Sequence, residues 1–312
     1  MSDANNQTAP ILIAGPTASG KSALALAIAE HVGGVIVNAD SMQVYRELRV
    51  LSARPAAEDE ARIPHALYGF VPAAEAYSTG RFMADAAEAI TAARQQGQRP
   101  IIVGGTGLYF KALLEGLSPI PRIDDAVRDH WRAEAERRGA AELHRELAAR
   151  DAAMAARLPP SDTQRIVRAL EVIDQTGTSL ADWQKIRGAP VIEETEAIRM
   201  CVSLERAELH QRADARFDSM IREGAIEEAR ALAALDLDPD LPAMRAIGVR
   251  PLLSAVAGQS TIEAAAEAAK LETRQYIKRQ ETWLRRNMIA WKQVNSKYME
   301  RNMRDIFAFI YP

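Results

Sequence analysis

Eight residues near the start of the chain have the types and spacing of a phosphate-binding loop. Gly15 is followed, after four residues, by Gly20, Lys21 and Ser22, with an apolar run before the loop and a helix-forming run after it. Glycines let the backbone fold tightly around an anion, so that consecutive N–H groups point inward. Lys21 supplies a charge for the outer phosphate oxygens, and the Ser22 hydroxyl is placed to bind Mg²⁺. The sequence therefore predicts a site for a diphosphate or triphosphate, formed by Gly15, Pro16, Thr17, Ala18, Ser19, Gly20, Lys21 and Ser22.

A carboxylate ends the second apolar run, residues 33–40. Asp40 stands where that strand is expected to end, beside the polar Ser41 and Gln43. Ligands of open α/β sheets bind at the carboxyl ends of the strands, so Asp40 is expected to share a crevice with the phosphate-binding loop. Asp is also a common residue at the start of a helix. That structural alternative stays open, although it does not explain Ser41 and Gln43.

A second glycine-rich segment, residues 104–107, follows the third apolar run, residues 100–103. It offers the hydroxyl of Thr106 at the same expected edge of the sheet. Taken alone, Gly-Gly-Thr-Gly is a weak signal.

The elements that must position these residues alternate between apolar runs and helical patterns, which predicts an α/β fold with a parallel sheet flanked by helices. The segment 54–80 contains three prolines and little periodicity, which favours a loop. Strands are expected at 11–14, 33–40, 100–103, 198–204 and 289–294, and helices at 23–30, 80–96, 206–223 and 261–286.

A change of composition after Gly116 indicates an inserted helical domain. Residues 118–121 are typical of a linker, and the charged stretch that follows predicts solvated helices at 125–138 and 140–150, with another at 162–175. We expect residues 1–117 and 191–312 to form the core and residues 118–190 the insertion. Near the start of the third helix, Gln164 and Arg168 share a face, and an arginine there opposes the helix dipole.

The long helix expected at 261–286 carries a basic stripe. Arg274, Lys278 and Arg285 lie near one side with Arg279 and Arg286 beside them, while Tyr276 and Trp283 share a face and are expected to pack inward. A basic stripe over an apolar one fits a helix that faces nucleic acid.

Length and composition exclude several classes of protein. The 312 residues suffice for more than one domain, and a net charge of −3 argues against indiscriminate coating of nucleic acid. One cysteine, Cys201, excludes an internal disulfide framework and a multi-cysteine zinc site. Neither a signal peptide nor a membrane span is apparent in the sequence, so we expect a cytoplasmic protein without a membrane partner.

Taken together, five segments resemble bacterial tRNA dimethylallyltransferases. They are Gly15–Ser22, Asn38–Gln43, Val103–Tyr109, Gln164–Glu171 and Thr273–Trp283, and the resemblance extends in order from about residue 10 to 294. That family transfers the dimethylallyl group of dimethylallyl diphosphate to N6 of adenosine 37 of tRNA, beside the anticodon. The resemblance implies a P-loop NTPase-like core with a helical RNA-binding insertion, acting as a monomer on the anticodon stem-loop.

The same resemblance assigns roles to individual residues. It implies that Thr17 to Ser22 hold the leaving diphosphate with Mg²⁺, although in other proteins such a loop is a nucleotide-binding or ATP-binding site. Asp40 matches the carboxylate that takes the N6 proton, Thr106 a hydroxyl beside the reacting centre, and Arg216 an arginine on the diphosphate. Residues matching tRNA contacts are Asp40, Ser41, Met42, Gln43, Thr106, Arg128, Gln164, Arg165, Ile166, Val167, Arg168, Arg274 and Lys278.

Three positions depart from the family's pattern, and two other functions remain open. Ser52 replaces a threonine, Val249 a tyrosine and Ile277 an alanine, which affects local RNA contacts more than chemistry. A small-molecule or nucleotide kinase would use the same core with ATP turnover and no RNA. A non-catalytic RNA-binding NTPase module would explain the basic helix but not Asp40.

Overall fold

The computed structural model describes residues 8–311, apart from the side chains of residues 300 and 302. The chain divides into two compact units. The first joins Met1–Leu114 to Val191–Pro312, and the second is Glu115–Pro190.

The first unit is built on a six-stranded sheet in which every pair of neighbouring strands is parallel. The strand order is β3-β2-β4-β1-β5-β6, which places β1 in the interior between β4 and β5. The predicted α/β core with a parallel, helix-flanked sheet is confirmed. The strands are β1 (Ile11–Ala14), β2 (Gly34–Asn38), β3 (His65–Ala66), β4 (Arg99–Gly104), β5 (Ile198–Ser203) and β6 (Lys292–Asn295).

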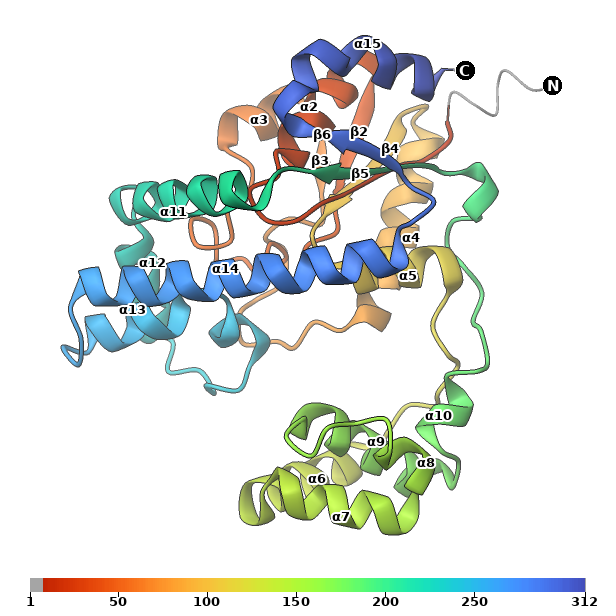
Figure 1. Cartoon of the computed structure of the whole chain (residues 1–312), viewed down its shortest axis with the longest axis vertical. Helices are drawn as coiled ribbons and strands as arrows, with labels where there is room; N and C mark the ends of the chain where they lie inside the picture. Colours follow the sequence, from red (N-terminus) through yellow and green to blue (C-terminus); the bar gives the residue numbers. More distant parts are fainter. Residues whose placement is uncertain (1–7, 312) are drawn as a thin grey trace. The chain divides into compact units, whose positions relative to one another are not determined.

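Successive side chains of a strand point to opposite faces of the sheet, so alternate residues belong to two separate apolar cores. Ile11 and Ile13 of β1 pack with α2 (Lys21–Val32) and α15 (Met299–Ile310) on one face of the sheet. Leu12 and Ala14 pack on the other face. That second core holds α4 (Thr79–Gln95), α5 (Gly107–Glu115) and α14 (Ile262–Asn287), and Figure 1 shows these helices on the side of the sheet away from α15.

α11 (Arg206–Arg222) follows β5 and lies beside α14 (Figure 1). Two ion pairs connect them, Asp214–Arg274 and Asp218–Lys270, each at 2.7 Å. The later residue of α11, Asp218, pairs with the earlier residue of α14, Lys270, so the two helices run antiparallel. The chain then continues through α12 (Ala225–Ala233), η2 (Pro242–Arg245) and α13 (Val249–Val256).

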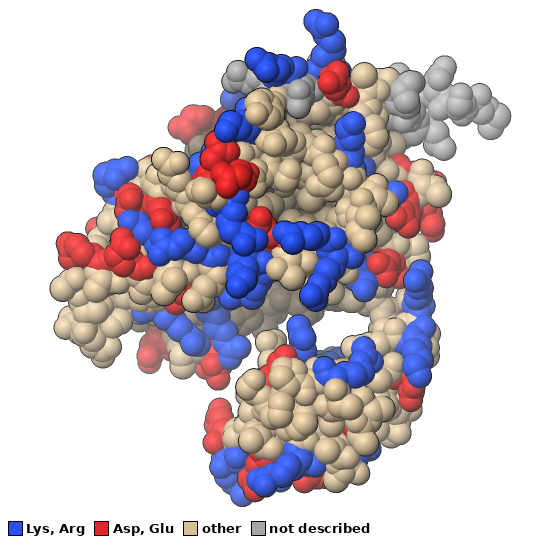
Figure 2. Space-filling model, in the orientation of Figure 1, with Lys and Arg blue, Asp and Glu red and all other residues tan. Residues whose placement is uncertain are grey.

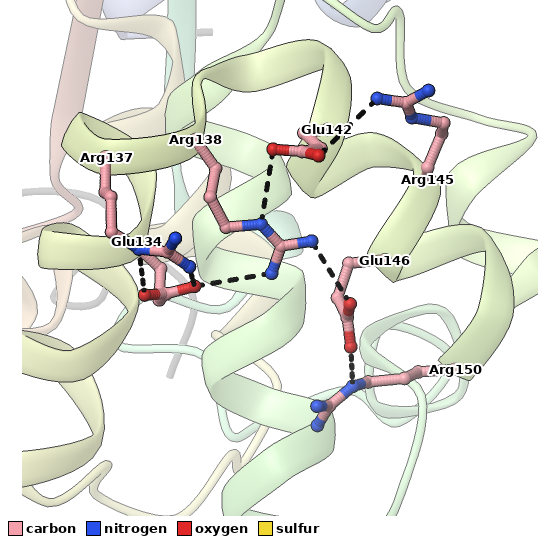
Figure 3. A network of polar contacts seen from close by, with 7 residues as sticks. All are labelled: Glu134, Arg137, Arg138, Glu142, Arg145, Glu146 and Arg150. Atoms are coloured by element: carbon pink, nitrogen blue, oxygen red, sulfur yellow. Dashed lines mark hydrogen bonds and ion pairs between the residues drawn. The ribbon is translucent and has the colours of Figure 1, made fainter.

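The second unit is wholly helical in its regular structure, with α6 (Asp125–Arg138), α7 (Ala140–Arg150), α8 (Ala152–Ala155), α9 (Thr163–Thr176) and α10 (Leu180–Trp183). Its core gathers around Trp131, which is 2% exposed and whose indole N–H donates to Asp174 at 3.2 Å. On the surface of this unit, ion pairs between arginines and glutamates connect α6 to α7 (Figure 3). Exposed ion pairs contribute little individually, so the apolar core holds these helices together.

The two ends of the second unit touch through glycines. A Cβ on Gly116 would lie 2.4 Å from the carbonyl oxygen of Gly188, and a Cβ on Gly188 would lie 2.0 Å from the carbonyl oxygen of Leu117. Only residues without a side chain permit this approach of the two backbones. In the first unit, the carbonyl of Leu113 accepts hydrogen bonds from the amides of Val191 and Ile192, at 2.9 and 3.0 Å.

Two expectations about secondary structure are wrong, and some helices were not predicted. The segment expected to be a loop, 54–80, contains α3 (Ala57–Arg62) and β3. α3 buries no residue and β3 is a two-residue edge strand, so neither produces an apolar period. The last strand begins at Lys292 rather than at 289, and α15 was not predicted. Two short 3-10 helices, η1 (Glu194–Glu196) and η3 (Ser296–Tyr298), complete the elements described.

Candidate active site

The phosphate-binding loop connects the buried β1 to the first turn of α2. Gly20 adopts a left-handed backbone, with φ of 85°, and no side chain caps the helix that starts after it. The first amides of α2 therefore stay available to an anion. Ser22 is exposed on that first turn, and its hydroxyl has no hydrogen-bond partner among residues 8–311. The hydroxyl of Ser19 is fully buried and also lacks a partner.

Lys21 is held over the loop, where its ammonium donates to the carbonyl of Pro16 at 3.3 Å. Burial lowers its pKa from 10.5 to about 8, nearby Asp40 opposes the shift, and Arg216 adds to it. Burial destabilises the charged form of Lys21, and Asp40 compensates this only in part. A bound anion would stabilise the ammonium, so these electrostatics are typical of an anion-binding site.

Asp40 lies in a tight turn directly after β2. Its carboxylate accepts the amide of Met42 at 3.0 Å, and no helix follows until α3. The helix-cap alternative for Asp40 is therefore wrong, because there is no helix for it to cap.

Asn38 holds this turn from inside the protein. The buried amide of Asn38 accepts the N–H of Asp40 at 2.8 Å and donates to the carbonyls of Asp40 and Leu67, each at 3.0 Å. Leu67 has a left-handed backbone, with φ of 65°, which is uncommon for such a residue. Asn38 thus fixes the backbone on both sides of the carboxylate.

Thr106 joins the third strand's glycine-rich segment to the Asp40 turn. Its hydroxyl accepts the amide of Ser41 at 3.0 Å and donates to the hydroxyl of Ser41 at 3.3 Å. The structure therefore brings together Asp40 and Thr106, which are 66 positions apart in the sequence.

Gln280 of α14 connects the phosphate-binding loop to the same segment. Its side-chain oxygen accepts the amide of Thr17 at 2.9 Å, and its side-chain nitrogen donates to the carbonyl of Gly105 at 3.0 Å. One turn earlier, the hydroxyl of Tyr276 interacts with both Gln280 and Thr106, and burial raises the pKa of Tyr276. α14 therefore sets the spacing between the loop and the Asp40 turn.

A cavity of about 260 Å³ opens between these elements. Thr17, Asp40, Arg216 and Tyr276 line its polar part. Burial lowers the pKa of Arg216 and the charge of Asp40 opposes the shift, yet Arg216 forms no ion pair within the part of the chain that the structure describes. The remaining lining is largely apolar and includes Leu51, Phe217, Met220 and Ile247.

The outer face of α14 is basic. Figure 2 shows Lys and Arg gathered over this helix, and a shallow depression there is lined by Lys278, Arg279, Trp283 and Arg286 among others. Lys278 is exposed, whereas Arg274 is bound to Asp214 and serves to connect α14 to α11. Trp283 packs partly inward, as expected. Tyr276 faces the cavity instead of the apolar core.

The expected RNA-contacting residues of the second unit lie on α6 and the first turns of α9. Gln164 and Arg165 are exposed, Arg168 pairs with Glu171 at 3.2 Å, and Arg128 pairs with Asp125 at 3.6 Å. The side chain of Ile166 is fully buried and Val167 packs against the same core. The side chain of Ile166 therefore belongs to the helical core and that of Val167 packs partly against it, and the expected RNA contact of this segment stays a prediction.

Several residues near the site have internal partners that the sequence did not indicate. The side chain of Gln43 donates to the carbonyls of Ser52 and Ala53, at 2.9 and 2.7 Å, and Ser52 donates to the carbonyl of Leu48. Ile277 is buried against Ala18 and Ala213. Of the three departures from the family pattern, Ser52 and Ile277 thus act within the fold, and Val249 is buried too.

Sequence reasoning missed the positioning roles of Asn38 and Gln280. Both lie inside segments that carry the resemblance, so the motifs indicated their importance without a role. Their partners could not be inferred, because the hydrogen bond from Thr17 to Gln280 spans 263 positions.

No group of three or more His, Cys, Asp or Glu residues among those described could hold a metal ion. Among residues 8–311, none of the helices combines the length and the apolar character that crossing a bilayer requires.

Comparisons with known proteins agree with this arrangement. The sequence pattern described as IPP transferase matches residues 43–287, and that described as isopentenyl transferase matches residues 9–66. The chain is 54% identical over 300 residues to a tRNA dimethylallyltransferase of Parvibaculum lavamentivorans, covering 96% of this chain and 95% of the relative.

Two solved structures have the same fold. A tRNA isopentenylpyrophosphate transferase from Bacillus halodurans is 30% identical, with a TM-score of 0.68 over 97% of both chains. A eukaryotic dimethylallyltransferase acting on tRNA is 24% identical, with a TM-score of 0.82 over 96% of this chain and 77% of that one.

Proposed function

Because the chain belongs to the IPP transferase family, we propose that it transfers the dimethylallyl group of dimethylallyl diphosphate to N6 of adenosine 37 in tRNA. The observation that carries the proposal is that a carboxylate, which can accept a proton, and a cation, which can bind a diphosphate, line one cavity. Asp40, Arg216 and Thr17 of the phosphate-binding loop line the same space of about 260 Å³. A kinase is not favoured, since both matching family patterns and the curated relative are prenyl transferases.

The diphosphate of the donor is assigned to the loop Thr17–Ser22. Burial lowers the pKa of both Lys21 and Arg216, and the charge of Asp40 opposes the shift without cancelling it, so an anion would compensate the charge that burial makes costly. During transfer the bond from C1 of the donor to the diphosphate oxygen breaks, and its electron pair leaves with the diphosphate. Preorganised cations and backbone amides stabilise that developing charge.

Asp40 is assigned as the group that accepts the N6 proton. The exocyclic amine of adenine is a poor nucleophile, because its lone pair is conjugated with the ring. As the N6–C1 bond forms, the nitrogen becomes acidic and a positioned carboxylate can take its proton. Asn38 and Met42 hold the Asp40 turn in place, and Thr106 offers a hydroxyl beside it.

The residues present fit Mg²⁺. The exposed hydroxyl of Ser22 has no partner among the described residues, and Mg²⁺ usually combines few protein ligands with phosphate oxygens and water. We assign Ser22 as its protein ligand, with the diphosphate supplying further oxygens. When bound there, the ion would neutralise charge that develops on the leaving group.

The anticodon stem-loop of tRNA is assigned to the basic outer face of α14 and to the second unit. Lys278 is an exposed cation of α14 suited to phosphate contacts, and Arg128, Gln164, Arg165 and Arg168 offer polar surface in the second unit. Adenosine 37 must leave its stack to reach a cavity. We expect a monomer acting in the cytoplasm, where its tRNA substrate is present.

Incubation of the protein with labelled dimethylallyl diphosphate and unmodified tRNA tests the proposal. Digestion of the tRNA should release N6-(dimethylallyl)adenosine, and tRNA with guanosine at position 37 should stay unlabelled. Turnover of ATP without RNA, together with unlabelled tRNA, would instead support a kinase.

A further inference from the structure

We infer that the apolar end of the cavity beside Asp40 receives the hydrocarbon tail of the donor, and that Met220 closes it against tails longer than five carbons. This inference rests on the proposed function and concerns the same site. It names the residues that select the donor.

The cavity has a direction, set by α11. Ala213, Arg216, Phe217 and Met220 line it along one face of that helix. A helix rises about 1.5 Å per residue, so Met220 lies about 10 Å further along the axis than Ala213. Ala213 packs against Ala18 of the phosphate-binding loop. Met220 is therefore at the end remote from the diphosphate.

α14 lines the cavity on the side opposite α11, and its residues can be placed along the same axis. α14 is antiparallel to α11, as the Asp214–Arg274 and Asp218–Lys270 pairs show. Tyr276 and Arg279 of α14 line the polar end of the cavity, and Thr273, next to Arg274, lies about level with Asp214 of α11. On α11 the charged Arg216 is followed by the apolar Phe217 and Met220, so the lining that this helix provides becomes apolar away from the loop.

The chemistry of displacement requires a lateral space for the tail. The attacking nitrogen and the leaving oxygen lie on opposite sides of C1, so the remaining carbons must extend sideways from that line. Asp40 and Thr17 mark the two ends of the reaction line within this cavity, and the apolar wall of Leu51, Phe217 and Met220 flanks it. Burial of apolar carbons against such a wall is favourable.

Buried side chains of the protein core line the far end of the cavity. Phe217 and Met220 are 4% and 7% exposed, and both belong to the main apolar cluster with Leu51. Phe217 lies so close to Gly248 that a Cβ there would approach its ring to 2.9 Å. At about 260 Å³, the space is below the roughly 300–1,000 Å³ of pockets that hold drug-sized ligands. A second isoprene unit would have to displace packed side chains.

The test measures kcat/KM with dimethylallyl diphosphate and with geranyl diphosphate, using the whole chain and tRNA. The unaltered protein should favour the five-carbon donor by at least about 10²-fold, since even one surplus methylene in a fitted pocket costs about 10–200-fold. Met220→Ala should reduce this preference at least tenfold. Leu51→Ala enlarges the cavity at the same apolar wall and should act in the same direction if Met220→Ala does not fold.

Met200→Ala is the matched control, because Met200 is buried in β5 and packs on the other face of the sheet. It should leave the donor preference unchanged. An unchanged preference in folded Met220→Ala and Leu51→Ala proteins that still use dimethylallyl diphosphate overturns the inference alone. Absence of product from either donor with the unaltered protein overturns the proposed function, and the inference with it.

Discussion

The side-chain oxygen of Gln280 lies 2.9 Å from the backbone nitrogen of Thr17, which donates a hydrogen bond to it. The other end of the same amide donates to the carbonyl of Gly105. One buried side chain of α14 therefore ties the phosphate-binding loop to the segment that carries Thr106.

Gln280→Met tests this bridge. Methionine has a similar length and no hydrogen-bonding amide, so the amide of Thr17 and the carbonyl of Gly105 both lose their partner. A buried unpaired group costs about 1–3 kcal/mol, so we expect a lower melting temperature and a single-turnover rate at least tenfold lower. Gln275→Met, on the exposed side of α14, is the control. An unchanged rate in a Gln280→Met protein at saturating substrates would show that the bridge has no part in positioning.

Asp40→Asn tests the proposed base. Asparagine can still accept the amide of Met42, so the turn is kept, but it cannot take the N6 proton. The rate should fall by about 10²–10⁴, the usual contribution of a positioned base, while both substrates still bind. Single-turnover rates, tRNA affinity and thermal melts on this variant distinguish chemistry from unfolding. Chemistry at the unaltered rate in a stable Asp40→Asn protein would end the assignment.

Lys21→Ala should remove most transferase activity and leave tRNA affinity nearly intact, because Lys21 lies in the phosphate-binding loop. Loss of one such charge typically lowers the rate by about 10²–10³. Full turnover of Lys21→Ala at saturating donor contradicts the assignment.

The lowered pKa of Lys21 predicts how donor binding depends on pH. In the donor-free protein this pKa is about 8, so the ammonium is present below pH 8 and lost above it. A bound diphosphate raises the pKa again, and the donor affinity should therefore fall about tenfold per pH unit above pH 8. Calorimetry with dimethylallyl diphosphate from pH 7 to 9.5 measures the effect. Lys21→Arg keeps the charge and should remove the dependence, and a similar slope in both proteins would assign it to another group.

The lowered pKa of Lys21 also affects the stability of the donor-free protein, and here the effect of rising pH is favourable, whereas it weakens donor binding. Between pH 8 and the ordinary value of 10.5, the unfolded chain holds a proton that native Lys21 has released. The contribution of Lys21 to the free energy of unfolding of the donor-free protein therefore rises with pH in this window.

Replacement of residues 115–190 by a short Gly-Ser linker tests the division of labour between the two units. The carbonyl of Leu113 already bonds to the amides of Val191 and Ile192, so the linker closes a short gap. We expect a folded core that binds dimethylallyl diphosphate with nearly unchanged affinity and has lost most of its affinity for tRNA. Loss of donor binding with the fold intact would show that the second unit contributes to the donor site.

The phosphate-binding loop was predictable because its residues are contiguous and its flanking strand and helix are strongly patterned. Asp40 and Thr106 were placed at the same edge of the sheet, since parallel strands present their carboxyl ends together. The partners of Asn38 and Gln280 were not predictable, because each depends on a segment distant in the sequence. Local sequence patterns also could not show that Arg274 is paired with Asp214 or that the side chain of Ile166 is buried.

The glycine contact between the two ends of the second unit bears on the order in which the chain folds. β1 pairs with β5, which places Ile11 opposite Ile198, so the sheet must close a very long loop. The entropic cost of closure grows with the length of the free chain. A folded second unit holds Gly116 against Gly188 and so removes the residues between them, more than a third of that length, from the loop. We therefore expect the helical unit to become structured before β5 joins the sheet, so that mutations in the core of that unit slow the formation of the sheet.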